Sequence, residues 1–489
     1  MVFKNHRSRY ALIKADFQPK KLKERKMKLK FDYNNMMVDA IGDKGICPCV
    51  FDKKAQSISD AYNKVMTGRG KGWQEWADLP YVSDEYLDEM ISYCSAVREK
   101  ADSFVVFGIG GSALGPLAVA SALIHLHHNE LPKEVRKAPK LYVEDNVDPE
   151  RMKALLDVID LKTAYFNVVT KSGETSETLS QFLILYALLK KELGEEEAKK
   201  HIIVTTTIGK GTLYNVAEKE GFKIYGVGAG VGGRFSVLCP VGLITFAVLG
   251  LDIKKMLRGA AVMADVSANA DIRKNPALLT AFLQYESMQK GYNVSVLMPY
   301  ADSLKYMADF YCQIWGESLG KAVDLDGKTV YVGQTPAKAL GVTDQHSQVQ
   351  LYTEGPFDKV VTFLAVENYR DTVVITDDRD VNACDFLKGH TLNELINAER
   401  KATEFALRKA QRANFTITLP VVDEETVGEL LMYFMYETAF AGALMNIDTF
   451  NQPGVEEGKK ATFAMLGRAG YEQKMEEING AEKKSEYII

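Results

Sequence analysis

Glu317 has the residue type and the surroundings for acid–base chemistry. It follows Gln313 by four positions, so on a helix the two side chains share a face. A lone glutamate near a helix end is usually a solvated surface group. Here the apolar side chains of Tyr311, Ile314 and Trp315 lie close in sequence, which suits a carboxylate that acts as a general base.

Two further side chains, His346 and Lys459, can carry protons and lie in polar segments. His346 is in the run Thr-Asp-Gln-His-Ser-Gln over residues 343–348, and an imidazole exchanges protons near neutral pH. Lys459 ends a loop over residues 451–459 that leads into the last helix. Taken alone, such a histidine is usually structural and such a lysine is a solvated cation.

A glycine-rich loop over residues 108–116 follows an apolar strand and opens a helix. Glycines such as Gly111 let the backbone approach an anion, and Ser112 adds a hydroxyl donor. The same run fits a dinucleotide pattern, which needs an acidic residue about 20 positions later. The next strand instead ends at Glu144 and Asp145. Alone, this loop is a weak signal, and a tight packing turn explains it equally well.

A second loop, over residues 170–177, also leaves an apolar strand and enters an amphipathic helix. Three hydroxyl side chains, Thr170, Ser172 and Thr175, gather there beside Lys171. Capping the helix needs one hydroxyl, so several hydroxyls with a lysine favour a phosphate monoester.

Arg234 follows a run of five glycines within residues 226–233. Glycines keep the backbone close to its neighbours, so this guanidinium is presented from a turn rather than from a mobile surface helix. A fixed guanidinium beside a reacting carbon stabilises a developing oxyanion. The alternative is a structural ion pair.

Composition excludes several classes of protein. The chain has 489 residues, enough for two or three domains of about 150 residues. It is 46% hydrophobic and 26% charged with a net charge of −5, so nucleic acid is not an expected partner. The longest apolar run, residues 237–251, contains Pro240 and falls short of the ~18 residues of a membrane span, so we expect a buried helix.

Cysteine and histidine usage argues against a metal centre. Cys47 and Cys49 lack a second close pair, so we expect neither zinc ligation nor a disulfide framework, and the pattern suits a reducing cytosol. His125, His127 and His128 form a cluster that we interpret as a solvated helix end rather than a metal site.

Residues 1–26 are basic and show no helical or strand period. Lys23-Glu-Arg25 corresponds to a purine-rich ribosome-binding stretch read in frame just before Met27, so we hypothesise that these residues are not part of the functional protein. A disordered basic tail is the alternative. After Met27 the sequence alternates as a strand does.

Residues 103–228 alternate apolar strands with helices. The predicted strands cover residues 103–107, 141–143, 165–169, 202–204 and 223–227, and one predicted helix covers residues 179–189. A less regular series follows, with strands at 294–298, 329–332, 360–366 and 372–375 and helices at 303–317 and 391–412. Such alternation predicts parallel sheets with helices on both faces.

We therefore predict an α/β protein with two doubly wound, flavodoxin-like αβα sandwich domains and helical N- and C-terminal extensions. The first domain is expected over residues 27–260, with its core at about 100–230. The second is expected over residues 261–430, and a helical segment over residues 431–489 would complete the active site.

Taken together, the runs described above resemble the two-domain sugar-isomerase (SIS) type of glucose-6-phosphate isomerase. The similarity begins near Met27 and keeps the same order along the chain. It rests on the two phosphate-side loops, the Arg234 run, the Gln313 and Glu317 helix, the His346 run and residues 451–459. Any one match would be unspecific, whereas these six matches in the same order identify the family.

The resemblance implies roles for particular residues. Glu317 would move a proton between C2 and C1 of the sugar, and Arg234 would stabilise a cis-enediolate. His346 and Lys459 would assist ring opening, with the histidine supplied by the neighbouring subunit of an obligate homodimer. Substrate-binding residues would be Gly111, Ser112, Thr170, Lys171, Ser172, Thr175, Gln313 and Gln452. The resemblance implies a cytoplasmic glycolytic enzyme with no metal and no cofactor, and neither nucleic acid nor membrane as a partner.

One position departs from the family pattern, and three alternatives remain. Glu174 stands where bacterial relatives often have threonine, which places a negative charge near the expected phosphate. The alternatives are another SIS enzyme, a sugar-phosphate sensor and a dinucleotide-dependent dehydrogenase. The first usually lacks the Glu317 helix and the Lys459 loop, the second does not need the proton-moving residues, and the third fails on the acidic spacing.

Overall fold

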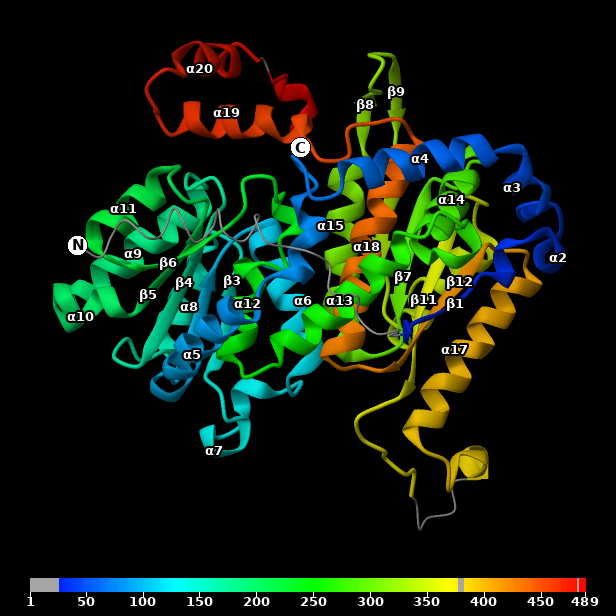
Figure 1. Ribbon diagram of the computed structural model, residues 1–489, viewed down its shortest axis with the longest axis horizontal. Coiled ribbons are helices and arrows are strands. Elements are labelled where there is room, and N and C mark those ends of the chain that lie inside the picture. The colour runs from blue at the N-terminus through cyan, green and yellow to red at the C-terminus, as the bar shows by residue number, and fades with distance from the viewer. Residues whose placement is uncertain (1–25, 377–381, 482) are drawn as a thin grey trace.

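The computed structural model describes residues 26–376, 382–481 and 483–489. The hypothesis about residues 1–26 thus falls, except for Lys26, outside the described residues. Two five-stranded sheets lie side by side, surrounded by helices, and a separate two-stranded hairpin projects from the body (Figure 1). This architecture confirms the predicted α/β class with parallel sheets.

The first sheet is entirely parallel, with strand order β3-β2-β4-β5-β6. Its strands are β2 (Ser103–Phe107), β3 (Lys140–Glu144), β4 (Ala164–Val169), β5 (Ile202–Thr206) and β6 (Lys223–Gly226). All five predicted strands are confirmed. The chain order reverses between β2 and β4, and ligands of open α/β sheets bind at the carboxyl ends of such a pair of strands.

Helices cover both faces of this sheet. They are α5 (Asp84–Lys100), α6 (Leu114–Leu123), α8 (Pro149–Val158), α9 (Ser176–Leu193), α10 (Glu195–Lys200), α11 (Thr212–Glu220) and α12 (Pro240–Val248). The short helix α7 (Lys133–Arg136) lies in the connection before β3, below the first sheet in Figure 1. The predicted helix at 179–189 lies within α9. The apolar run at 237–251 contains the fully buried α12, and Pro240 begins this helix rather than interrupting it.

The second sheet has the order β1-β12-β11-β7-β10, and only β1 is antiparallel to its neighbour. Its strands are β1 (Lys30–Asp32), β7 (Val294–Pro299), β10 (Thr335–Lys338), β11 (Lys359–Asn368) and β12 (Asn414–Val421). β1, β7 and β11 were predicted, whereas β10 and β12 were not. The predicted strand at 372–375 is wrong, because Val374 forms only an isolated bridge with Thr391. The predicted strand at 329–332 is β9 (Thr329–Val332), which pairs with β8 (Lys321–Val323) in the projecting hairpin.

Helices from distant parts of the chain surround the second sheet. They are α2 (Val38–Ile41), α3 (Cys49–Lys53), α4 (Ala55–Gly68), α13 (Ile253–Ser267), α14 (Pro276–Gln289), α15 (Lys305–Leu319), α16 (Val349–Glu354), α17 (Leu392–Lys409) and α18 (Glu424–Leu444). The predicted helices at 303–317 and 391–412 correspond to α15 and α17. Helix α15 packs both on α18 and on α6, so it joins the second sheet to the first.

One hydrophobic core fills the space between the two sheets. Strand side chains alternate between faces, so Phe104 and Val106 enter this central core, whereas Val105 and Phe107 enter a second cluster beneath α9. A third cluster lies on the outer face of the second sheet and includes Leu407 of α17. All these strand residues are buried, as in a sheet covered on both faces.

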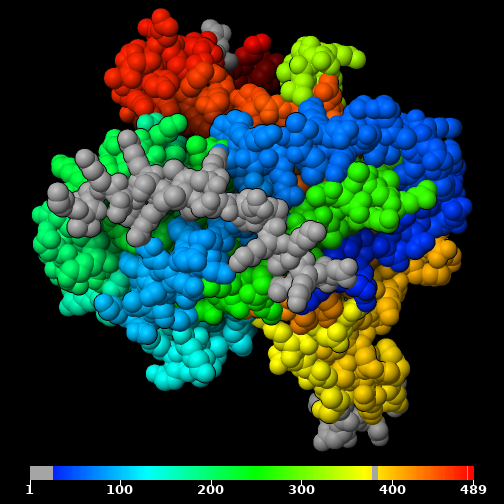
Figure 2. All heavy atoms as spheres, viewed as in Figure 1, coloured from blue at the N-terminus to red at the C-terminus, as the bar shows by residue number. Residues whose placement is uncertain are grey.

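The C-terminal segment forms a separate layer. After α18 the chain runs through a loop to α19 (Glu456–Met465) and α20 (Glu472–Asn479), which contact each other. In Figures 1 and 2 this red segment lies along the top edge of the molecule. Its surface is mostly exposed, including the side chains of Met465 and Leu466.

The structure corrects two expectations about cysteine and histidine. Cys47 and Cys49 form a disulfide, although their separation of two residues means that it joins no distant segments. His128 is buried, with Nε2 3.0 Å from the carbonyl oxygen of Pro139, so it is not part of a solvated helix end, whereas His125 and His127 are exposed. Within the described ranges, no helix is long and apolar enough to cross a membrane.

Candidate active site

Three loops meet at the carboxyl edge of the first sheet, following β2, β4 and β6. The β2 loop and the Arg234 loop touch so closely that a Cβ atom on Gly111 would lie 2.2 Å from the carbonyl oxygen of Gly233. Gly110 adopts φ +56° and approaches the Gln313 amide of α15. The glycines therefore allow backbone and side chains of separate segments to converge at the chain reversal.

Arg234 lies at the centre of this convergence, in the short 3-10 helix Gly233–Phe235, and is 4% exposed. Its guanidinium donates five hydrogen bonds: Nε to Ser318 Oγ (2.7 Å), Nη1 to Glu317 Oε2 (3.1 Å) and Gln452 Oε1 (3.0 Å), and Nη2 to the carbonyl oxygens of Thr449 (2.7 Å) and Asn451 (3.2 Å). Burial lowers the pKa of this guanidinium, and the Glu317 carboxylate opposes the shift. The group stays positively charged, since arginine ionises far above neutral pH.

Glu317 lies near the carboxyl end of α15, with its side chain 38% exposed. One carboxylate oxygen accepts from Arg234, and the other accepts from Gln313 Nε2 at 3.1 Å. The predicted sharing of a helix face by Gln313 and Glu317 is thereby confirmed. Both oxygens are oriented by donors while the group keeps access to solvent, as a base that must reach a substrate requires.

The hydroxyl groups of the loop after β4 bond to one another. Thr170 Oγ1 lies 2.7 Å from Thr175 Oγ1 and 3.3 Å from Ser172 Oγ. Thr175 occupies the N-cap position of α9, yet its side chain makes no capping hydrogen bond. The hydroxyls are therefore not explained by helix capping and remain grouped at a helix N-terminus, where an anion is favoured. Glu174 is exposed beside them.

Lys171 lies in the same loop and is only partly exposed. Burial lowers the pKa of its ammonium group to about 8, with the Glu75 carboxylate opposing the shift. The ammonium lies 4.2 Å from the centre of the Trp73 ring. A partly desolvated cation beside this group of hydroxyls is suited to bind a dianion.

His346 and Lys459 lie away from these contacts. His346 is exposed at the end of the 3-10 helix Thr343–His346. Lys459 is 54% exposed on α19 and pairs with Glu456 at 2.8 Å. Among the contacts found in the described parts of the chain, none joins either residue to Glu317 or Arg234. The chain thus brings together Glu317, Arg234, Gln313 and Gln452 but not these two.

Several residues that complete the site were missed in the sequence. Ser318 and the carbonyl oxygens of Thr449 and Asn451 bind Arg234. Lys321 Nζ donates to the carbonyl oxygens of Glu317 and Ser318, both at 2.8 Å, and so caps the end of α15. Carbonyl acceptors carry no residue-type signal, whereas Lys321, four residues after Glu317, is at the spacing expected for a cation at a helix end.

The described residues contain no group of three or more His, Cys, Asp or Glu side chains placed to hold a metal ion. The acidic and basic groups of the site instead bond to one another. Their arrangement, a carboxylate base beside a buried guanidinium with hydroxyls and an ammonium nearby, can accept a proton, stabilise an oxyanion and hold a phosphate.

Comparison with known proteins gives a consistent result. The sequence matches the phosphoglucose isomerase family over residues 84–483. It is 50% identical to a glucose-6-phosphate isomerase of Carboxydothermus hydrogenoformans over 464 residues, covering 95% of this chain and 100% of that relative. It is 42% identical to a glucose-6-phosphate isomerase of Rubrobacter xylanophilus over 390 residues, covering 79% of this chain and 88% of the relative.

Solved structures agree with the fold. A hypothetical protein from Thermus thermophilus is 34% identical with a TM-score of 0.81, covering 90% of this chain and 100% of that one. A glucose-6-phosphate isomerase from Chlamydia trachomatis is 22% identical with a TM-score of 0.71, covering 83% of this chain and 81% of that one, which supports the fold alone.

Proposed function

This chain belongs to the phosphoglucose isomerase family and interconverts glucose 6-phosphate and fructose 6-phosphate, and we propose that it does so without a metal ion, through a cis-enediolate. The observation that carries this mechanism is the 3.1 Å contact between Glu317 and the buried Arg234. It places a carboxylate that can accept a proton directly beside a fixed positive charge.

The proposed chemistry is a proton transfer between adjacent carbons. Glu317 removes the proton from C2 of the open-chain aldose, and the electron pair moves to give an enediolate. The proton of the C2 hydroxyl passes to the C1 oxygen, which moves the negative charge to the C2 oxygen. The same carboxylic acid then returns its proton to C1 while the C2 oxygen becomes the carbonyl of the ketose. The Arg234 guanidinium stabilises the oxyanion without reorganising, since burial and five hydrogen bonds hold it.

The phosphate group is proposed to bind at the loop after β4. Thr170, Ser172 and Thr175 would donate hydroxyl hydrogen bonds, and Lys171 would supply positive charge. Gly111, Ser112, Gln313 and Gln452 would hold the sugar between this loop and Glu317. Binding at the remote phosphate orients the reacting carbons and so contributes to the rate.

Ring opening is proposed to depend on His346 and Lys459 in a homodimer with shared active sites. The exposure of both residues, away from the Arg234 contacts, supports a site completed by other surfaces. His346 of the partner subunit would reach the sugar ring oxygen, and Lys459 would approach as the C-terminal segment settles over the site. We further propose cytoplasmic glycolysis and gluconeogenesis as the setting, and the domain boundaries predicted from the sequence.

Turnover of fructose 6-phosphate to glucose 6-phosphate by the purified full chain, with EDTA present, tests the proposal. We expect undiminished activity, because the proposed steps use only side chains of the protein. Loss of activity on chelation, with recovery on adding a divalent metal, would overturn the metal-free mechanism. Binding of sugar phosphate without turnover would instead favour a sensor.

A further inference from the structure

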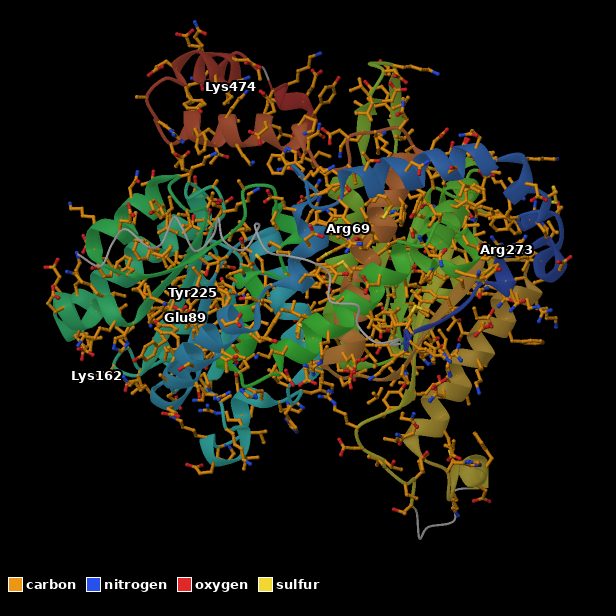
Figure 3. All side chains as sticks on the ribbon, in the orientation of Figure 1. Arg69, Glu89, Lys162, Tyr225, Arg273 and Lys474 are labelled. Carbon is orange, nitrogen blue, oxygen red and sulfur yellow. A yellow bond between two sulfur atoms is a disulfide. The ribbon has the colours of Figure 1, made fainter. Side chains whose placement is uncertain are left out.

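Residues 69–75 run from the end of α4 into the first residue of the 3-10 helix Glu75–Tyr81, and they were not part of the sequence-predicted site. Two glycines with positive φ, Gly70 and Gly72, form the turn, and Gly70 N donates to the Gln74 carbonyl oxygen at 3.1 Å. Arg69 fixes its start through Nε to Asp78 Oδ1 at 3.3 Å (Arg69 is labelled in Figure 3). We refer to residues 69–75 as the 69–75 turn.

The 69–75 turn contacts the loop that carries Arg234. Gln74 forms a backbone bridge with Val231, and Glu75 Oε2 accepts a hydrogen bond from Gly230 N at 3.1 Å. A Cβ atom on Gly230 would lie 1.8 Å from the carbonyl oxygen of Gly72, so the two backbones touch. The turn is therefore held in place from the Arg234 side.

The same turn presents Trp73 to the phosphate side of the site. The Trp73 side chain is 54% exposed, unlike Trp76 and Trp315, which are fully buried. Its ring lies under the Lys171 ammonium at 4.2 Å, a distance at which the negative face of the indole attracts a cation. A large exposed aromatic side chain at a polar site is unexplained by core packing.

We propose that Trp73 is a positioning residue for the known reaction, holding the Lys171 ammonium toward the phosphate of the substrate. This inference rests on the proposed role of the loop after β4. The ring shields one side of Lys171 from water and limits its rotamers, which strengthens its attraction to a dianion and lowers the entropy lost on binding.

The charges around Lys171 set a pH dependence. Its pKa is lowered to about 8 by burial, with Glu75 opposing the shift and Lys210 reinforcing it. Cys239 also faces it, and because burial raises the pKa of that thiol to about 12, it stays uncharged here. Above about pH 8 the amine loses its proton and holds a phosphate dianion less well, so the KM for fructose 6-phosphate should rise.

Steady-state kinetics of Trp73→Ala, Lys171→Ala and the double variant test the proposal. We expect Trp73→Ala to raise KM about three- to ten-fold with little change in kcat, from the loss of the cation–π contact. Because Trp73 acts through Lys171, adding Trp73→Ala to Lys171→Ala should raise KM little further. Removing the ring also exposes the Lys171 ammonium to water, which reverses part of the burial that lowers its pKa. The rise in KM at alkaline pH should therefore move to higher pH.

Two variants control for general effects. Trp73→Phe keeps an aromatic face and should recover most of the affinity lost in Trp73→Ala. Phe405→Ala removes another exposed aromatic side chain, 65% exposed on α17 against 54% for Trp73, and should leave KM unchanged. An unchanged KM in Trp73→Ala, or an equal rise with and without Lys171, would overturn the inference.

A measurement without turnover separates this inference from the proposed reaction. Titration with inorganic phosphate should change the tryptophan fluorescence of the wild-type chain, and Trp73→Phe should abolish the change, since the other two tryptophans are buried. A wild-type chain that shows this response but no isomerase activity would overturn the reaction alone. An active chain whose phosphate response survives Trp73→Phe would overturn the role of Trp73 alone.

Discussion

The Arg234 region and the pair His346 and Lys459 differ in how the fold holds them. Arg234 is 4% exposed, and its five hydrogen bonds reach separate parts of the chain. His346 is exposed, and Lys459 is 54% exposed, with an ion pair to Glu456 on the same helix. Contacts within one chain therefore fix the Arg234 region, whereas His346 and Lys459 stay exposed on the surface.

The difference follows from the cost of burying charge. A buried guanidinium is tolerated only when every donor finds an acceptor, which fixes both its position and that of its partners. Glu317, Ser318 and the loop over residues 449–452 are thus held in one arrangement before substrate arrives. Exposed side chains carry no such constraint, so their placement must come from substrate or from another subunit.

Glu317→Gln is expected to have the largest effect in the Arg234 region. The amide cannot accept a proton, so we expect kcat to fall about 10^4-fold while KM changes little. Glutamine has the same shape, and the thermal midpoint should stay near that of the wild type. Stopped or coupled assays with fructose 6-phosphate measure the loss, and Glu85→Gln on α5, exposed and away from the site, is the matched control. Turnover near the wild-type value would remove Glu317 as the base.

Arg234→Lys keeps the charge but removes the planar set of donors. A lysine cannot reach Ser318, Gln452 and two carbonyl oxygens at once, so oxyanion stabilisation is lost and the loop over residues 449–452 loosens. We expect kcat to fall about 10^3-fold together with a lower melting temperature. If only the melting temperature fell, the guanidinium would be structural rather than part of the chemistry.

His346→Ala probes the exposed pair. We expect kcat to fall about 10^2-fold with cyclic substrate, from the loss of proton transfer to the ring oxygen, without loss of stability. A mixed dimer contains one His346→Ala chain and one Glu317→Gln chain. If each site takes Glu317 from one chain and His346 from the other, one of its two sites has both native residues. Equal mixing of the two variants after subunit exchange should then restore up to about a quarter of wild-type activity. No recovery in verified mixed dimers would place His346 and Glu317 of the same chain in one site.

The fold was largely predictable because its central strands are buried on both faces. The apolar runs of β2, β4 and β7 carry a strong signal. β10 was missed because it has four residues, includes Pro336 and lies at a sheet edge, where proline is tolerated. β12 alternates polar and apolar residues as a strand does, so its signal was present in the sequence and was overlooked. The apolar stretch at 372–375 lies in an exposed segment, and hydrophobicity alone does not provide a partner strand.

The site was predictable where side-chain type carries the chemistry. Glu317, Gln313 and Arg234 are in contact as expected, and the hydroxyls of the loop after β4 gather at one helix start. Backbone carbonyl acceptors and the 69–75 turn were not predictable, since their roles arise from tertiary contacts between distant segments. The resemblance also assigned His346, from the neighbouring subunit, and Lys459 to the same site. Among the described residues no contact joins either one to Glu317 or Arg234, so this assignment stays a prediction.

Glu437 on α18, unlike Arg234, is a buried ionisable group without a full set of hydrogen-bond partners. It is fully buried, and although Thr280 and Tyr433 face it, Oε1 accepts no hydrogen bond from the described residues. Burial raises the pKa of this carboxyl to about 7. Between the ordinary glutamate pKa and about pH 7, the folded state therefore binds more protons than the unfolded state. The stabilising contribution of the protonated Glu437 carboxyl is lost as pH rises through this window.

Glu437→Gln should remove this loss of folding stability at higher pH, because an amide does not ionise. We expect the variant to gain stability relative to the wild type as pH rises from about 5 to about 8, by on the order of 2 kcal/mol, with kcat unchanged. Denaturant unfolding at several pH values measures the difference. The pKa of Glu429 is also raised to about 7 by burial, so the comparison must be between variant and wild type rather than with a flat baseline. An identical pH slope in both proteins would mean that Glu437 stays charged in the folded state, and that an incompletely paired buried carboxylate costs this fold little.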